Sequence, residues 1–124
     1  MGRLVSTSCR SVKKKGEDTF SVLDVVLGGV PVHLSLVADG HGGDRAAAMC
    51  ASELLTEIAG EAKDSSPKEL ERAMKQVFIM IHERIRAETT AGAAVTVVAI
   101  NMSTHTLTCA NVGDSVRVQQ SSRR

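Results

Sequence analysis

The stretch that begins at Ser66 constrains the fold most, because it carries every signal of an amphipathic helix. Ser66 is a favourable N-cap, Pro67 suits the first helical position, and Glu69 completes a capping-box pattern. Apolar side chains then recur at helical spacing, at Leu70, Met74, Val77, Phe78, Ile81 and Ile85. This spacing predicts a helix whose apolar stripe packs on a core. His82, beside the stripe, is interpreted as a helix-edge residue and not as a catalytic one.

A second helix is predicted over residues 44–58, before the first one in the chain. Its apolar side chains also follow helical spacing, at Ala47, Cys50, Ala51, Leu54, Leu55 and Ile58. Gly60 stands where a C′ glycine would end this helix. Residues 62–65 form a polar linker, so we expect the two helices to lie antiparallel.

Strand-like runs flank the two helices. Residues 19–27 and 30–38 are rich in β-branched and apolar side chains, and Gly28-Gly29 between them predicts a β-hairpin. After the helices, residues 93–101 and 106–112 predict two more strands around a turn, and a third begins near residue 116. Together these elements favour an α+β layer packing with a mainly antiparallel sheet.

The run from Val95 to Ile100 is apolar at nearly every position. A strand that alternates in and out of water would show polar residues on one of its faces, and this run does not. We therefore expect a central strand that is covered on each side.

Composition limits the classes of partner. The 124 residues fit one domain, and only 2% of them are aromatic, so small aliphatic side chains must build the core. Fifteen Lys and Arg against fourteen Asp and Glu leave a net charge of +1, which provides no general attraction for nucleic acid. The basic run Lys13-Lys14-Lys15 is interpreted as a solvated loop, because stacking aromatics are missing.

The cysteines indicate a reducing compartment. Cys9, Cys50 and Cys109 are widely spaced and form no Cys-x-x-Cys pair, so neither a disulfide framework nor a zinc site is expected. No run has the length and apolarity of a membrane span, and the stretch from Met1 to Ser6 has no apolar h-region, so we expect no secretory signal. These features predict a cytoplasmic or nuclear protein. Gly2 followed by Ser6 also matches the loose pattern for N-myristoylation, which stays open as an alternative.

Acidic residues next to predicted strand ends form the candidate reaction site. Asp39-Gly40-His41-Gly42-Gly43 should present a carboxylate and an imidazole at a strand-to-helix turn, with glycines that let the backbone approach a ligand. Glu17-Asp18 precede the first predicted strand, and Asp114 follows the strand over 106–112. Carboxylates from separate strand ends can converge on magnesium or manganese. Each of them alone would equally fit an ordinary turn or cap.

The order of these motifs resembles the protein phosphatase 2C family, the metal-dependent Ser/Thr phosphatases. The matching stretches are Lys13-x-x-x-Glu17-Asp18, Val37 to Gly43 leading into an Ala-rich helix, Gly92 to Val98, and Ala110-Asn111-Val112-Gly113-Asp114-Ser115. The resemblance implies hydrolysis of phosphoserine and phosphothreonine in phosphoprotein substrates, with magnesium or manganese as cofactor. An unrelated magnesium-dependent hydrolase would not explain why all the motifs fall in order.

The resemblance also implies a role for each acidic residue. Asp39 matches the carboxylate that bridges two metal ions. The carbonyl of Gly40 and the carboxylate of Glu17 match further ligands of the second ion, and Asp18 supports that shell. Asp114 matches an acidic residue near a weaker additional metal. A water or hydroxide between the ions would be the nucleophile, so no side-chain nucleophile is implied.

Other positions either match the family or depart from it. His41 matches the general acid that protonates the leaving oxygen. Lys13 replaces an arginine that grips the substrate phosphate, and lysine lacks the planar fork of that residue. The stretch Gly92-Ala93-Ala94-Val95 lacks two hydroxyl side chains, and Arg117 falls one place later than usual.

A complete domain of this family is longer and supplies further aspartates, whereas no residue after Asp114 is acidic. We therefore expect one truncated domain over residues 1–124, an incomplete αββα arrangement in which a partial β-sandwich is flanked by two antiparallel helices. Exposed sheet edges in such a domain would favour self-association or pairing. The alternative function is a catalytically incomplete, phosphatase-like binding or regulatory module.

Overall fold

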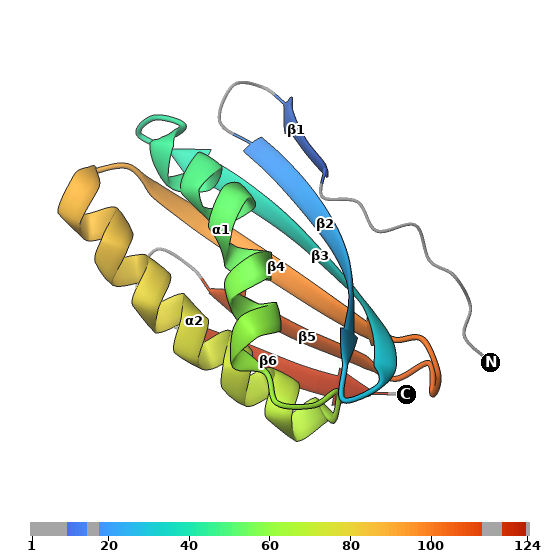
Figure 1. The fold of residues 1–124 in the computed structure, drawn as a ribbon. Helices are drawn as coiled ribbons and strands as arrows, with labels where there is room; N and C mark the ends of the chain where they lie inside the picture. Colours follow the sequence, from blue (N-terminus) through green and yellow to red (C-terminus); the bar gives the residue numbers. More distant parts are fainter. Residues whose placement is uncertain (1–9, 15–17, 113–117, 124) are drawn as a thin grey trace.

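A single antiparallel sheet carries both helices on one of its faces in the computed structural model, which describes residues 10–14, 18–112 and 118–123 (Figure 1). The strands follow one another across the sheet in chain order. The elements are β1 (Arg10–Lys14), β2 (Asp18–Leu27), β3 (Val30–His41), α1 (Arg45–Glu61), α2 (Pro67–Glu88), β4 (Gly92–Asn101), β5 (Leu107–Val112) and β6 (Val118–Arg123). The predicted α+β class and antiparallel sheet are confirmed.

The predicted hairpin is confirmed, and its turn sets the register of the sheet. Gly28 and Gly29 have φ angles of 57° and 80°, the signature of a type I′ turn that suits the twist of two joined strands. Each residue of β2 pairs with the residue of β3 that is equally far from this turn, up to the pair Asp18 and Asp39.

Strand β3 runs three residues further than predicted. Asp39, Gly40 and His41 do not lie in the strand-to-helix turn; they pair with Ala94, Ala93 and Gly92 of β4. Pairing continues because the facing stretch of β4 is also extended, so the backbone groups of both strands satisfy one another. The turn itself is shorter, and α1 starts at Arg45.

The interpretation of Lys13 and Lys14 as a loop was wrong, because both residues belong to β1, which pairs with β2. Charged residues are common on edge strands, where they discourage further pairing, so a short basic segment gives little sequence signal for a strand. The predicted start of the last strand, near residue 116, lies within residues 113–117, which are outside the described part; the described strand β6 covers Val118–Arg123.

Apolar side chains of the helices and of one sheet face form the core. The predicted stripe of the second helix is buried from Leu70 to Ile81, and Ile85 is half-buried. Leu34 and Leu36 of β3 and Val97 of β4 face the helices with 1% exposure or less. β4 is central in the strand order, as predicted, but within the described residues only one of its faces is covered.

Helix α1 continues past its predicted end. Gly60 lies inside the helix, and the C-cap is Ala62, whose N–H donates to the Ile58 carbonyl. Arg72 of α2 explains the extension, since its guanidinium donates to the backbone oxygen and to the carboxylate of Glu61 at 3.0 and 3.1 Å. A tertiary contact thus overrides the tendency of glycine to end a helix.

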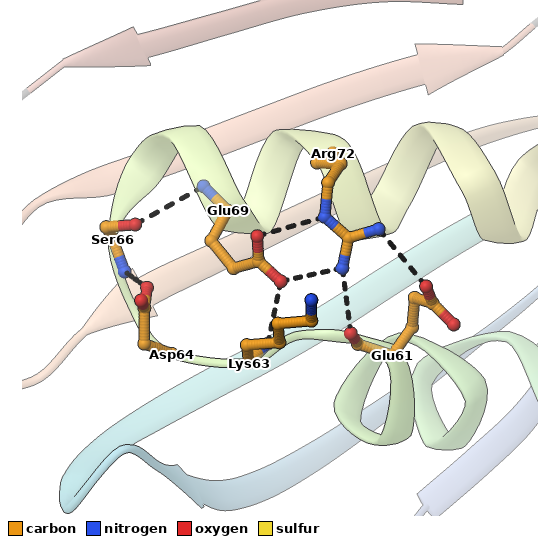
Figure 2. Close-up of polar contacts among 6 residues, drawn as sticks. All are labelled: Glu61, Lys63, Asp64, Ser66, Glu69 and Arg72. Carbon is orange, nitrogen blue, oxygen red and sulfur yellow. Dashed lines mark hydrogen bonds and ion pairs between the residues drawn. The ribbon is translucent and has the colours of Figure 1, made fainter.

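The start of α2 has the predicted cap in a modified form (Figure 2). The Ser66 hydroxyl accepts from the Glu69 N–H at 3.3 Å, but the Ser66 N–H donates to the Asp64 carboxylate at 2.8 Å and not to Glu69. The Glu69 carboxylate instead accepts from the Lys63 N–H and from Arg72. The cap therefore also stabilises the connection between α1 and α2, through Lys63 and Asp64.

Ion pairs between α1 and α2 confirm the antiparallel arrangement. Two of these contacts join the start of one helix to the end of the other, and a third group joins the middle of α1 to α2. The pairs are Arg45 with Glu88, Arg84 with Glu53 (2.8 Å) and Glu57 (3.2 Å), and Arg72 with Glu61 (3.1 Å).

Acid should weaken the connection between the helices. The hydrogen bond from Arg72, together with the one from the Lys63 N–H, holds the pKa of Glu69 at about 2, below its ordinary value of 4.5. A lowered folded-state pKa stabilises the protein above pH 4.5 and loses that contribution as the pH falls toward 2. As the pH falls from 4.5 to 2, we expect the melting temperature of a Glu69→Gln variant to decrease less than that of the wild type. Parallel slopes for the two proteins in thermal melts would contradict this expectation.

Ser21 is an unfavourable core residue. Its hydroxyl lies on the helix-facing side of β2, is fully buried, and has no hydrogen-bond partner among the described residues. We expect Ser21→Ala to raise the free energy of unfolding by about 1 kcal/mol, because an unsatisfied polar group leaves the core. Urea unfolding measures the change, with Ser35→Ala on the opposite face as control. A destabilised Ser21→Ala protein would disprove the assignment.

Candidate metal centre at one end of the sheet

Two aspartates lie opposite each other at the end of the β2–β3 hairpin. Asp18 and Asp39 are direct partners in the antiparallel register, and Asp39 is exposed. Its neighbours Ala38 and Gly40 are buried beneath the helices. Successive residues of a strand point to opposite faces, so Asp39 belongs to the face turned away from the helices, which we call the open face.

Glycines shape the passage from this strand end to α1. Gly42 and Gly43 have φ angles of 72° and 124°. A Cβ on Gly43 would lie 3.8 Å from the Cβ of Ala91, an ordinary contact, so space does not exclude a side chain there. The backbone angle is what requires glycine. The predicted role of these glycines thus applies to the turn after His41.

The register also places the basic residues of β1. Lys14 pairs with Asp18, and Lys13 pairs with Thr19, one step further along β2. The row that crosses the sheet through Asp39 therefore contains Lys14 and not Lys13. Lys13 remains a predicted phosphate-binding residue, and Lys14 is a second basic residue at this end of the sheet.

The other predicted site residues are described to different extents. Glu17 and Asp114 lie outside the described residues, and for Asp18 and His41 the structure gives the strand position. Within the described part of the chain, no three His, Cys, Asp or Glu side chains form a cluster of metal-binding type. The donor chemistry fits a hard divalent cation, since carboxylates and the Gly40 carbonyl would be oxygen ligands.

A polar pair beside Asp39 was missed from the sequence. The Thr96 hydroxyl donates to the side-chain oxygen of Asn111 at 2.6 Å, and both residues are exposed. Thr96 pairs with Val37, two residues before Asp39. Ala94, which pairs with Asp39, is exposed and offers no such group. The motif match drew attention to Asp114, whereas Asn111 needed the register to reveal its partner.

A small cavity lies away from the aspartates, between the two helices and strands β4 and β5. It holds about 40 Å³ and is lined mainly by apolar side chains, with Cys50 and His82 among them. Burial raises the pKa of the Cys50 thiol to about 12, so this cysteine is protonated at neutral pH and is a poor nucleophile.

Neither helix in the described residues combines the length and apolarity that crossing a lipid bilayer requires.

Comparison with known proteins extends the match beyond these motifs. The family model of protein phosphatase 2C matches residues 2–121. "Protein phosphatase 2C homolog 2" of Saccharomyces cerevisiae is 31% identical over 84 residues, which cover 64% of this chain and 18% of the yeast protein. The chain thus spans less than a fifth of the length of that curated relative.

A solved structure shares the fold. That structure, of a C. elegans sex determining protein, matches 98% of this chain and 35% of its own chain with a TM-score of 0.62 and 21% identity. At this level of identity the similarity concerns the fold alone. The family model, in contrast, matches nearly the whole sequence, including the paired aspartates and the glycine turn. The chain belongs to the protein phosphatase 2C family.

Proposed function

We propose that this chain carries part of the active site of a metal-dependent protein phosphatase that acts on phosphoserine and phosphothreonine. The observation that supports this most is the register that sets Asp18 opposite Asp39 at the end of the sheet where Gly40 and His41 follow. Paired carboxylates and a backbone carbonyl at one strand end form a suitable set of oxygen donors for magnesium or manganese.

The residues divide between metal binding and proton transfer. Asp39 would bridge two ions, Gly40 and Glu17 would complete the ligands of one, and Asp18 would support them. Asp114 would lie near an additional, weaker metal. When bound, such ions acidify water and neutralise the negative charge of the phosphoryl group.

The chain's own groups would then orient the substrate and move a proton. The bond between phosphorus and the serine or threonine oxygen breaks as the oxygen of a water molecule attacks phosphorus. His41 would donate a proton to the leaving oxygen, so that the alcohol departs neutral. Lys13 would hold the phosphate as a point charge, less precisely than an arginine does.

The biological setting belongs to the same proposal. Phosphoproteins would be the substrates, in the cytoplasm or the nucleus, and residues 1–124 would be a single domain of the phosphatase type. Among the described residues, β1 and β6 are the outer strands of the sheet, and unpaired backbone groups at such edges would allow pairing with another chain.

Removal of metal tests the proposal. We expect the protein to release phosphate from a phosphothreonine peptide with manganese, to stop when EDTA is added, and to recover when manganese is returned in excess. Phosphate release that persists in EDTA would contradict the assignment, because no metal-free nucleophile is part of it.

A second function is favoured by particular positions. Ala94 has no hydroxyl beside Asp39, and Lys13 replaces the arginine of the family pattern. A binding or regulatory module of phosphatase type would show negligible turnover with manganese but would retain a phosphoprotein partner. The peptide assay separates the two functions, since turnover by this chain decides for the enzyme.

A further inference from the structure

The hydrogen-bonded side chains of Thr96 and Asn111 lie on the open face, at the same end of the sheet as the candidate metal centre. Val95 and Val97 of β4 are buried beneath the helices, so Thr96 between them belongs to the opposite face. Ala110 of β5 is buried in the same way, and Asn111 follows it on the opposite face. The pair and the carboxylate of the proposed bridging residue therefore share one surface.

The register brings the hydroxyl of Thr96 near Asp39. Asp39 pairs with Ala94, and Thr96 is two residues further along the same strand. Diagonal neighbours of this kind on one sheet face have Cα atoms about 7–8 Å apart. A hydroxyl and a carboxylate at such a distance are joined most readily through a water molecule. Ala94 ends at its Cβ, so its side chain leaves room for that water.

The hydrogen bond to Asn111 determines what the Thr96 hydroxyl can still offer. A hydroxyl has one proton to donate and two lone pairs that accept. Thr96 donates its proton to Oδ1 of Asn111 at 2.6 Å, so only its lone pairs remain for a further partner. That partner must be a hydrogen-bond donor. Water in the hydration shell of a divalent cation is a strong donor, because the cation polarises its O–H bonds.

We propose that Thr96 is a positioning residue of the candidate metal centre. Its hydroxyl, held as an acceptor by Asn111, receives a hydrogen bond from water in the hydration shell of a divalent cation bound at Asp39. This inference rests on the proposed metal-dependent function, and it adds two residues that are not themselves metal ligands. Partners of this indirect kind orient the groups around a metal, and their loss typically weakens metal binding about 10–100-fold.

A second hydroxyl pair in the same part of the chain provides a matched control. Thr104 and Thr106, in the connection between β4 and β5, have hydroxyl oxygens 2.8 Å apart. They lie at the other end of β4, beyond Asn101, whereas Asp39 pairs near its beginning. Thr106→Val therefore removes the same kind of hydrogen bond at a distance from the carboxylates.

Manganese binding tests the role of Thr96 without any need for turnover. In Thr96→Val, whose side chain has nearly the same shape, we expect the dissociation constant for manganese in calorimetry to rise by about tenfold. The relaxation rate of water protons in the presence of the bound manganese should also change, because water in the shell loses an acceptor. Thr96→Ser should restore both values, and Thr106→Val should leave both unchanged. Asn111→Ala should weaken manganese binding several-fold and carries the test if Thr96→Val fails to fold by circular dichroism.

Asp39→Ala distinguishes failure of this inference from failure of the proposed function. Equal manganese binding by the wild type and Asp39→Ala would remove the metal centre, and the role of Thr96 with it. Loss of binding in Asp39→Ala together with wild-type binding and water relaxation in Thr96→Val would leave the metal centre in place and overturn the role of Thr96. Equal losses in Thr96→Val and Thr106→Val would also overturn it, because they would indicate a general effect on the sheet.

Discussion

Asp39→Ala is expected to reduce manganese-dependent phosphate release by more than about a hundredfold, since even loss of an indirect partner of a metal ligand costs up to about that factor. Asp39 is exposed and lies opposite Asp18, so removal of its carboxylate should leave one of the two facing charges. The fold should survive, because alanine creates no cavity at an exposed position. Manganese binding measured by calorimetry should weaken in parallel with activity.

Glu83→Ala is the control for this substitution. Glu83 is an exposed carboxylate on α2, on the side of the sheet away from Asp39, and its removal changes the net charge by the same amount. We expect the Glu83→Ala variant to release phosphate from the peptide at the wild-type rate. If Asp39→Ala and Glu83→Ala both retained full activity, Asp39 would have no place in the site.

Leu34→Ala should destabilise the protein by about 2–5 kcal/mol, the usual cost of a large cavity in a core. Leu34 is completely buried in β3 and faces the helices. Domains of this size are stable by only about 5–15 kcal/mol, so this loss is a large fraction of the total and should move the denaturation midpoint to a clearly lower denaturant concentration. Chemical denaturation followed by circular dichroism measures the loss.

Ile79→Ala is the control for Leu34→Ala, because it removes a side chain of the same composition from an exposed position. Isoleucine and leucine contain the same atoms, and Ile79 is 48% exposed on α2. Its replacement should cost less than about 1 kcal/mol, because alanine is also the better helix former. Similar losses for the two variants would show that the helix-facing side of β3 is not the tightly packed core.

The sequence predicted the fold where local signals agreed with tertiary contacts. The cap at Ser66 and the apolar stripe after it were sufficient for α2, because both depend on neighbours in the chain. Gly60 does not end α1 as predicted, because Arg72 of α2 stabilises the last turn of α1. A contact of this kind has no local signal, so a single sequence did not reveal it.

The candidate site was predicted in its motif but not in its geometry. A two-residue turn at Gly28-Gly29 pairs residues symmetrically, so the pairs Asp18–Asp39 and Asp24–His33 could both have been found by counting outward from the turn. β1 could not have been found in this way, because five mostly polar residues at a sheet edge lack alternating hydrophobicity. Thr96 and Asn111 are direct partners on the neighbouring strands β4 and β5, but the connection between these strands is longer than a two-residue turn, so counting outward from it does not fix their register.

Successive residues of strand β3 point alternately to the core and to the open face of the sheet. Even-numbered residues from Val32 to Ala38 fill the core, whereas odd-numbered ones, including His33 and Asp39, line the open face. Deletion of one residue between the hairpin turn and Asp39 would exchange the two sets, so that leucines would face water and the proposed metal ligand would enter the core. Evolution can therefore lengthen or shorten this segment only in steps of two residues if both surfaces are to survive.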